Sequence, residues 1–358
     1  MPASSIDTFF ACSLMVILIA SAMVGTAKVV QPHLKDMSSL GGLDYAEGFT
    51  EYLLLSTGNP PDWGKIVSVV PQAFGLASTS SHPYALDIDK VSRLNSENVF
   101  AISYSDIAKG IGIELVPSSV EIRFLFEASI SLISYEALEN ETIYTFQIIT
   151  NKSGFPISAS LQSYFVTENY VDKVSSSTNS SGIGIMNASL PNAIEAAASL
   201  LVFAKASTNP QMMAFSTYCL GHNSDPPEPN KTFLKLSPAN HILNVSLSHP
   251  QVDILNVYIF TYNYGFNLTR NDIGNQTEEY NIPYLLDVSP MIFVLIGSNG
   301  STSFAEWTSY PQLPLEIGAD MWDSPARSKT IALTYIVSIN AVLYEAVISC
   351  RNAENYDE

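Results

Sequence analysis

The first pattern along the chain is an uncharged apolar run, TFFACSLMVILIASAMVGTA, at residues 8–27. Asp7 precedes this run and Lys28 follows it. Twenty residues in an α-helix extend about 30 Å, which matches the hydrocarbon thickness of a bilayer. A cleaved secretory signal would begin with basic residues, and the opening MPASSID contains none. The run therefore predicts a hydrophobic helix that spans a membrane.

The helical pattern continues beyond the uncharged run. Apolar residues recur at helical spacing through residues 28–55, for example at Leu43 and Phe49. Pro32 is expected to kink this helix, because proline lacks a backbone donor and collides with the preceding turn. The turn sequence GNPP at 58–61 marks its end. We therefore predict one helix of roughly fifty residues, half of it in lipid and half of it exposed.

Two further helices, both short, are predicted to begin at capping residues. Asp87 is a candidate N-cap for the first, and Ser103 or Ser105 for the second. Gly110 and Gly112 are candidates for the end of the second helix. We expect both helices to pack on the exposed half of the long helix.

After Pro117 the pattern changes to the period of two that is typical of β-strands. β-Branched and aromatic residues are frequent, and turn residues recur about every ten positions, which is typical of β-sandwiches. The low-complexity stretch SSSTNSSG at 175–182 is predicted to be an exposed loop. The predicted strands are at residues 120–133, 142–149, 158–167, 182–188, 198–206, 212–220, 242–247, 255–262, 291–297 and 331–339.

The predicted fold class is α+β, with a long N-terminal hydrophobic helix followed by immunoglobulin-like β-sandwich modules. The second module could pair with strands before residue 135, which would make the immunoglobulin-like part an insert. The predicted parts are an N-terminal helix at 1–57, a helical packing segment with the first strands at 58–135, an immunoglobulin-like sandwich at 136–225 and a second sandwich module at 226–358.

One late segment, Thr330 to Cys350, is apolar enough to suggest a second membrane helix. It contains Asn340 and Glu345, which are costly in lipid. Its apolar residues also alternate with smaller or polar ones. We therefore predict two strands joined near Asn340-Ala341, with the membrane helix as the alternative.

Net charge narrows the possible partners. The chain of 358 residues has a formal charge of −18. A nucleic-acid partner needs a basic surface, which this composition does not provide.

Nine N-x-S/T sequons, all after residue 139, favour an exported chain that carries N-glycans. Their asparagines are Asn140, Asn151, Asn179, Asn187, Asn230, Asn244, Asn267, Asn275 and Asn299.

The sequence offers little reactive chemistry. Cys219 and Cys350 are the only cysteines outside the apolar run, and they could form a disulfide or remain buried thiols. Cys219 and His222 form a C-x-x-H pair, but a zinc site needs further ligands. We find no nucleophile elbow, P-loop or zinc-protease motif. The prediction is a protein without cofactor or metal that is not an enzyme.

Three segments carry a resemblance to a known family. They are SSIDTFFACSLMVILI at 4–19, EYLLLSTGNPPDWG at 51–64, and FGLASTSSHPYALDIDKVSRLNS at 74–96 with SDIAKGIGI at 105–113. Over about the first 130 residues the chain resembles archaeal type IV pilin-like proteins with a class III signal, particularly the large minor-pilin-like ones. In that family a peptidase cuts just before the helix and leaves an acidic fifth residue. A cut before Ala3 would make Asp7 that residue, although no Lys/Arg-Gly precedes the cut here.

The resemblance implies a role for Asp7 in assembly. Its carboxylate would pair with the terminal amine of a neighbouring subunit inside a filament, whereas in a simple anchor Asp7 would cap the helix. The leading hypothesis is a structural subunit of a cell-surface filament that associates with copies of itself or other pilin-like subunits. The alternative is a single-span anchored adhesin or envelope protein that does not polymerise. An extracellular hydrolase ranks far behind both.

Overall fold

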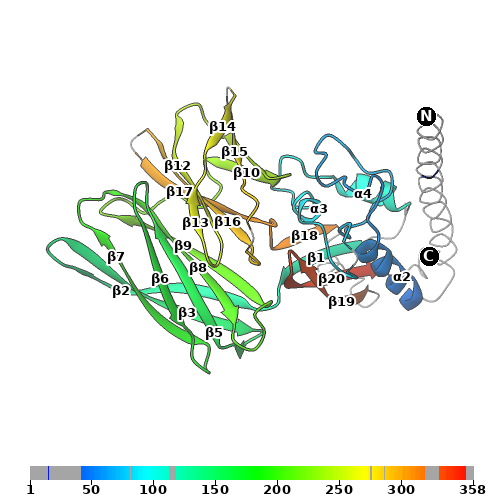
Figure 1. Cartoon of the computed structure of the whole chain (residues 1–358), viewed down its shortest axis with the longest axis horizontal. Coiled ribbons are helices and arrows are strands. Elements are labelled where there is room, and N and C mark those ends of the chain that lie inside the picture. The colour runs from blue at the N-terminus through cyan, green and yellow to red at the C-terminus, as the bar shows by residue number, and fades with distance from the viewer. Residues whose placement is uncertain are drawn as a thin grey trace, which may run out of the picture.

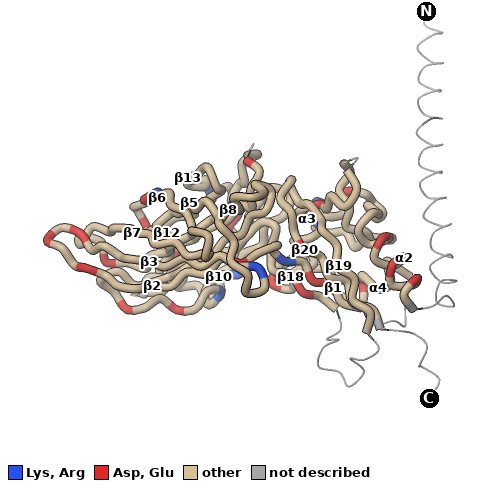
Figure 2. Tube along the Cα trace, turned by 90° about the horizontal axis from the view of Figure 1, so that it is seen from below, with Lys and Arg blue, Asp and Glu red and all other residues tan. Residues whose placement is uncertain are grey.

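The structure is a computed structural model, and it describes Met15 and residues 42–80, 82–112, 118–274, 276–285, 287–300, 302–318 and 330–351. Figure 1 shows an elongated arrangement, with the helices at one end and the largest sheets at the other. Figure 2 gives the same arrangement from below. We call the helical end with its own sheet the base (residues 42–124 and 315–351) and the two large sandwiches the arm (residues 127–310).

The predicted membrane helix at 8–27 lies outside the described residues apart from Met15, and so does Asp7. In the part of the chain that the structure describes, no helix is long and apolar enough to cross a membrane. Of the predicted helix of fifty residues, the described portion is α2 (Gly42–Leu55). Its buried residues Ala46, Phe49 and Leu53 face the base.

The two predicted short helices are confirmed with their caps. The Asp87 side chain accepts hydrogen bonds from the backbone of Asp89 and Lys90 at the start of α3 (Ile88–Ser92). Ser103 caps α4 (Tyr104–Ile111), and Gly112 ends it in the left-handed conformation, with φ 77°. Both helices share the apolar core of the base with α2.

The base sheet is assembled from strands that are far apart in sequence. Its strand order is β18-β1-β20-β19, and every neighbouring pair is antiparallel. β1 precedes the arm and the other three strands follow it, so the arm is an insert in the base. The predicted hairpin of β19 and β20 turns at Asn340 and Ala341, which both have positive φ. The strands are β1 (Ser118–Phe124), β18 (Leu315–Gly318), β19 (Thr330–Ile339) and β20 (Val342–Arg351).

The first sandwich has an immunoglobulin-like strand order. Named A to G along the chain, its main strands form one sheet A-B-E and a second sheet C′-C-F-G. The first sheet is β2 (Glu127–Ala137), β3 (Glu141–Lys152) and β7 (Ile183–Pro191), with the short β4 (Phe155–Pro156) beside β3. The second sheet is β6 (Val171–Ser177), β5 (Ala159–Val166), β8 (Ala196–Ala206) and β9 (Met213–His222).

The second sandwich repeats this plan and also has a strand D. Its sheets have the orders A-B-E-D and C′-C-F-G. The first sheet is β10 (Leu234–Ala239), β11 (Ile242–Leu247), β15 (Thr277–Asn281) and β14 (Arg270–Ile273). The second is β13 (Gly265–Asn267), β12 (Val252–Phe260), β16 (Met291–Asn299) and β17 (Thr302–Tyr310).

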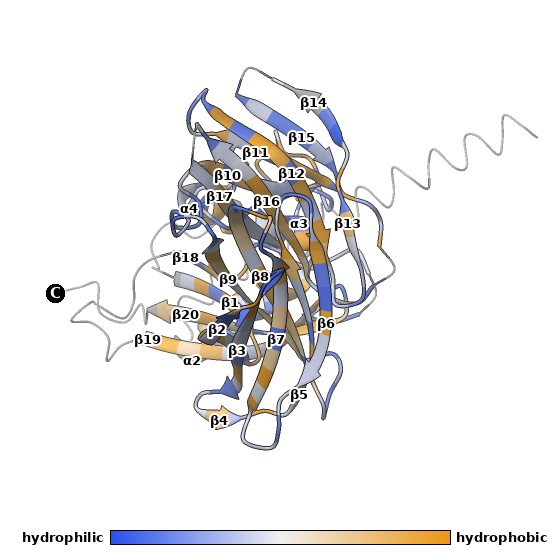
Figure 3. Ribbon diagram, turned by 90° about the vertical axis from the view of Figure 1, so that its left-hand side faces the viewer, coloured by the Kyte–Doolittle hydropathy of each residue, from blue (hydrophilic) through white to orange (hydrophobic). Residues whose placement is uncertain are grey.

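Several strands of the structure were not predicted, and one predicted loop is partly strand. The loop predicted at 175–182 is strand up to Ser177, because the serines of β6 pair with β5 at the edge of its sheet. Strands β10, β14, β15, β17 and β18 had no clear alternation. Figure 3 shows why for two of them: β14 and β15, at the outer edge, are mainly polar.

The two sandwiches pack sheet against sheet. The outer faces of their C′-C-F-G sheets share one apolar cluster, which includes Tyr164, Leu201 and Phe203 from the first and Phe260 and Val294 from the second. Strand β8 is consequently buried along both faces, and its sequence AAASLLVFAKA is a continuous apolar run rather than an alternating one. The arm is therefore a four-layer stack, and the two sandwiches are not joined by a flexible hinge.

Candidate functional site: the base, the arm and their joint

Two of the three segments that carry the family resemblance, at 51–64 and 74–96, form a buried polar cluster in the base. The turn after α2 contains the cis peptide Asn59-Pro60 and places Trp63 in the core. Gly58 has φ 73°, and a Cβ there would lie 2.6 Å from the Ala73 carbonyl oxygen. The Trp63 indole donates to the Gly75 carbonyl at 3.1 Å. The turn is thus a structural element, and the described part of this region presents no reactive group.

Two cations complete this cluster. The Lys90 Nζ, fully buried, donates to the carbonyls of Thr57 and Ala77 at 2.9 and 2.7 Å. Burial lowers the pKa of Lys90 to about 8, although Asp87 opposes the shift. The Arg93 guanidinium donates to five backbone carbonyls, which belong to Trp63, Ile66, Val67, Val69 and Phe100. These two side chains donate hydrogen bonds to loop carbonyls, which in a sheet would be bonded to backbone amides.

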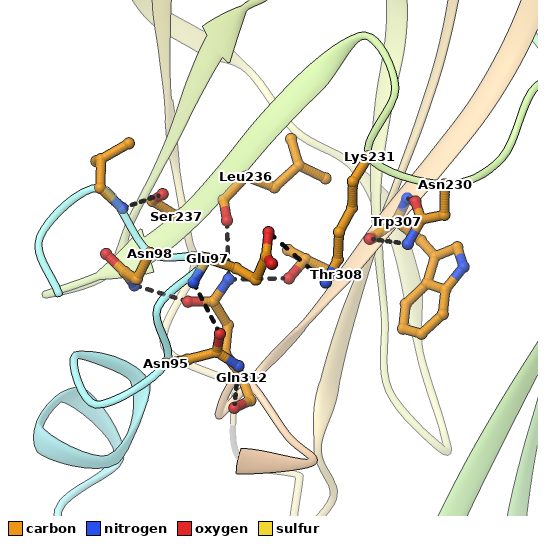
Figure 4. Close-up of polar contacts among 11 residues, drawn as sticks. Asn95, Glu97, Asn98, Asn230, Lys231, Leu236, Ser237, Trp307, Thr308 and Gln312 are labelled. Carbon is orange, nitrogen blue, oxygen red and sulfur yellow. Dashed lines mark hydrogen bonds and ion pairs between the residues drawn. The ribbon is translucent and has the colours of Figure 1, made fainter. Parts of the chain in front are cut away.

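A polar joint connects the base to the second sandwich (Figure 4). The Asn98 amide donates to Gln312 Oε1 at 2.7 Å and to the Pro238 carbonyl at 3.2 Å. The Gln312 amide in turn donates to the Leu236 carbonyl at 2.8 Å. The Val99 amide donates to Ser237 Oγ at 2.9 Å. Because Asn98 and Ser237 are buried, these bonds fix the direction in which the arm leaves the base.

A second anchor of the joint is a buried carboxylate. Asp89, which is 1% exposed, accepts a hydrogen bond from the Tyr310 hydroxyl at 2.5 Å and one from the backbone amide of Asn240 at 2.6 Å. Burial and the neighbouring Asp89 raise the pKa of Tyr310 well above its ordinary value. This carboxylate links α3 to the turn between β10 and β11.

Residues 226–230 (PPEPN) form the linker between the two sandwiches, and strand β17 holds this linker in place. Glu306 is 1% exposed and accepts from the amides of Phe233 and Leu234 at 2.6 and 2.9 Å. Burial raises the pKa of Glu306, while the backbone amides oppose the shift. The neighbouring Asn230 exchanges two hydrogen bonds with the Trp307 backbone, at 3.1 and 2.8 Å. The PPEPN linker is therefore clasped along the sandwich edge.

Hydrogen bonding within the fold distinguishes two of the predicted glycosylation sites. The side-chain amide of Asn230 donates to the Trp307 carbonyl and that of Asn267 donates to Asn256 Oδ1, so these two sequons are poor acceptors for a glycan. Asn275 lies outside the described residues. Asn140, Asn179, Asn187 and Asn267 are exposed, and Asn151, Asn244 and Asn299 are half-buried. All nine sequons belong to the arm, and the sequence of the base contains none.

Cys219 and Cys350 are free thiols in the structure. Cys219 lies in β9, where its thiol donates to Ser199 Oγ at 3.6 Å. Cys350 lies in β20, opposite Ile331 in the base sheet. The possible disulfide between them is not formed, because the two strands belong to different parts of the molecule. Burial raises the pKa of both thiols, that of Cys350 to about 12.

The C-x-x-H pair is not a metal site either. His222 is fully buried, and its two ring nitrogens contact the Tyr144 hydroxyl at 2.7 Å and the Pro191 carbonyl at 3.0 Å. Among the described residues, no group of three His, Cys, Asp or Glu side chains could hold a metal ion.

A polar hollow of about 590 Å³ lies between the sandwiches, lined by Glu195, Asp225 and Ser303 among others.

Comparison with known proteins adds little to this geometry. No known protein family and no curated protein matches the chain. Solved structures with partial likeness include the FN1-FN3 domains of chicken CNTN1, with 13% identity over 54% of this chain and 67% of that chain and a TM-score of 0.18. HBP35 of Porphyromonas gingivalis has 11% identity over 57% of this chain and 67% of that chain, also with a TM-score of 0.18. Scores this low carry no argument, so the immunoglobulin-like description rests on the strand orders.

Proposed function

We propose that the protein is a structural subunit of an extracellular, archaeal type IV pilus-like filament, in which the N-terminal helix assembles and the arm points outward. The observation that carries the proposal is the position of the arm. It is inserted between β1 and β18 of the base, whereas the N-terminal segment joins the base through α2 at the opposite end. A chain built in this way can pack its helix and base against neighbours while the arm stays free.

The distribution of sequons supports the same orientation. All nine lie in the arm, which has 184 residues, and none lies in the base, which has 120 residues. A glycan needs an exposed position and would obstruct close packing. A base without sequons and an arm with nine is therefore the pattern expected of a subunit that meets its neighbours through the base.

A single-span anchored surface protein is the second candidate. The same base and arm would then stand on a membrane, with the helix at 8–27 in lipid. The uncharged run of twenty residues favours this candidate as much as the first, because its length suits a bilayer. What distinguishes the two is whether Asp7 pairs with a neighbouring subunit.

Substitution of Asp7 tests the filament directly. A charge buried among identical helices needs its partner, and losing one partner costs about 3–5 kcal/mol. An N-cap contributes only about 1 kcal/mol, and asparagine caps as well as aspartate. We therefore expect Asp7→Ala and Asp7→Asn both to block incorporation into filaments while membrane insertion continues, measured by comparing sheared filaments with membrane fractions. Normal assembly of Asp7→Asn would make the residue a cap and remove this support.

A further inference from the structure

Among the residues that the structure describes, one edge of the base sheet has main-chain groups without a strand partner. Strand β19 (Thr330–Ile339) pairs with β20 along its whole length, without a register shift. On its other side, the Ser338 amide donates to the Tyr84 carbonyl at 2.9 Å, and the Ser338 carbonyl accepts from the Leu86 amide at 2.8 Å. Ser338 therefore directs its main-chain groups away from β20.

The same direction follows for alternate residues along the strand. Residues two positions apart on an unbroken strand direct their amides and carbonyls to the same side. Ala332, Thr334 and Ile336 thus present three amides and three carbonyls at the open edge. Within the described ranges, no strand pairs with this stretch. An edge of this kind is a template for another strand.

The side chains at this edge do nothing to discourage pairing. Proteins usually protect an edge strand with lysine, proline, a bulge or very short length. β19 has ten residues, TIALTYIVSI, with no charge, no proline and no bulge. The opposite edge strand, β18, has only four residues and carries Glu316. Ala332, Thr334 and Ile336 are exposed, and Ile336 keeps 49% of its surface in solvent.

We infer that β19 pairs with β19 of a second copy of this chain, in antiparallel orientation, so that two base sheets join into one. Two features favour a second copy over an unrelated protein. The chain has a net charge of −18, so most of its faces repel a copy, whereas strand β19 itself carries no charged residue. An antiparallel pairing of a strand with itself also closes on a two-fold axis, the commonest symmetry of homo-oligomers.

The position of the edge suits this contact. β19 belongs to the base, which contains no sequon, so glycans on the arm leave it uncovered. The inner face of β19 packs on α2, and the open edge is therefore next to the end where the N-terminal segment joins the body. The contact does not depend on Asp7, so it can form whether the protein polymerises through its helix or only shares a membrane with its copies.

Proline at position 334 tests the inference selectively. Because the Thr334 amide points away from β20, Thr334→Pro removes an edge donor and leaves the β19–β20 hydrogen bonds in place. The full chain in detergent would be measured by sedimentation over a range of concentrations, with Thr334→Ala as the matched control that retains the amide. Wild type and Thr334→Ala should shift from one copy to two as concentration rises, and Thr334→Pro should stay at one.

Two further measurements keep the test decisive. If Thr334→Pro fails to fold, Ile336→Lys places a charge at the edge through an exposed side chain and should also hold the chain at one copy. In hydrogen exchange of the wild type, protection of the Thr334 amide should rise with concentration, while the Leu333 amide should be protected throughout. A wild type that remains a single copy, or a Thr334→Pro or Ile336→Lys variant that still pairs, would overturn the inference. Asp7 variants leave this pairing unchanged if the inference is right, so failure here is separable from failure of the filament.

Discussion

The base and the arm are held together by different kinds of interaction. In the base, two buried cations, Lys90 and Arg93, hold long loops through backbone carbonyls. In the arm, apolar sheet faces carry the contacts, and β8 is buried on both sides. The arm is therefore stabilised by the stacking of its sheets, whereas the base depends on hydrogen bonds from a few buried polar side chains. Each difference can be tested by a substitution.

The largest effect is expected at the contact between the two sandwiches. Phe203 is fully buried, but its side chain faces away from the core of its own sandwich and toward the second. Phe203→Ala should lower the free energy of unfolding by about 3–5 kcal/mol, as for a core phenylalanine. Urea denaturation would compare it with Phe146→Ala, which lies inside the first sandwich. A loss near zero for Phe203→Ala alone would mean that the sandwiches are not packed together.

The base should respond to alkaline pH through Lys90. Its pKa in the folded protein is about 8, against an ordinary value of 10.5. Between these values the unfolded chain holds the proton more tightly, so this residue makes stability rise with pH. Relative to Lys90→Met, wild-type stability should therefore rise by about 2–3 kcal/mol from pH 7.5 to pH 10.5, because each pKa unit is worth about 1.4 kcal/mol. If chemical denaturation gave the same pH dependence for wild type and Lys90→Met, this would contradict a lowered pKa of Lys90.

The linker clasp should show a smaller effect. Glu306 accepts from the Phe233 and Leu234 amides, and Glu306→Gln retains one acceptor but loses the charge. We expect a loss of about 1–3 kcal/mol in the free energy of unfolding. Proteolysis should also become faster at the 226–230 linker, while cleavage elsewhere is unchanged. An equally resistant linker in Glu306→Gln would show that Asn230 alone holds it.

Glycan occupancy should change stability least and still separate the two parts. Mass spectrometry of protein from its native host should find glycans at several exposed arm sites, such as Asn140, Asn179 and Asn187. Asn230 should be empty, because its amide is bonded to the Trp307 backbone. Occupancy of Asn230 with the others empty would contradict the structure of the clasp.

Much of the fold could be predicted from local pattern. The caps Asp87 and Ser103, and the hairpin at Asn340-Ala341, are set by neighbouring residues and were predicted correctly. The sequence suggested an insert, but only of the immunoglobulin-like module within the second module, whereas in the structure both sandwiches are inserted between β1 and β18 of the base. Strands such as β14 were missed, because its sequence RNDI is mainly polar and shows no alternation of apolar and polar residues.

The polar interior of the base was beyond sequence reasoning. Lys90 and Arg93 lie in a charged, loop-flanked segment that predicts solvent exposure, yet both are buried. Their partners are backbone carbonyls up to 33 residues away, which leave no mark on the sequence pattern. The contact between the sandwiches has a signal in the continuous apolar run of β8, but the run alone does not identify what covers it.

In the proposed filament, the base packs against neighbouring subunits while the arm projects outward. Electron cryo-microscopy of surface filaments from the source cells tests this arrangement most directly. The expected map has N-terminal helices in the filament core, bases around them and rigid two-sandwich arms at the outside. Filaments that lack this chain, with the protein found only as single copies in the membrane, would contradict this arrangement.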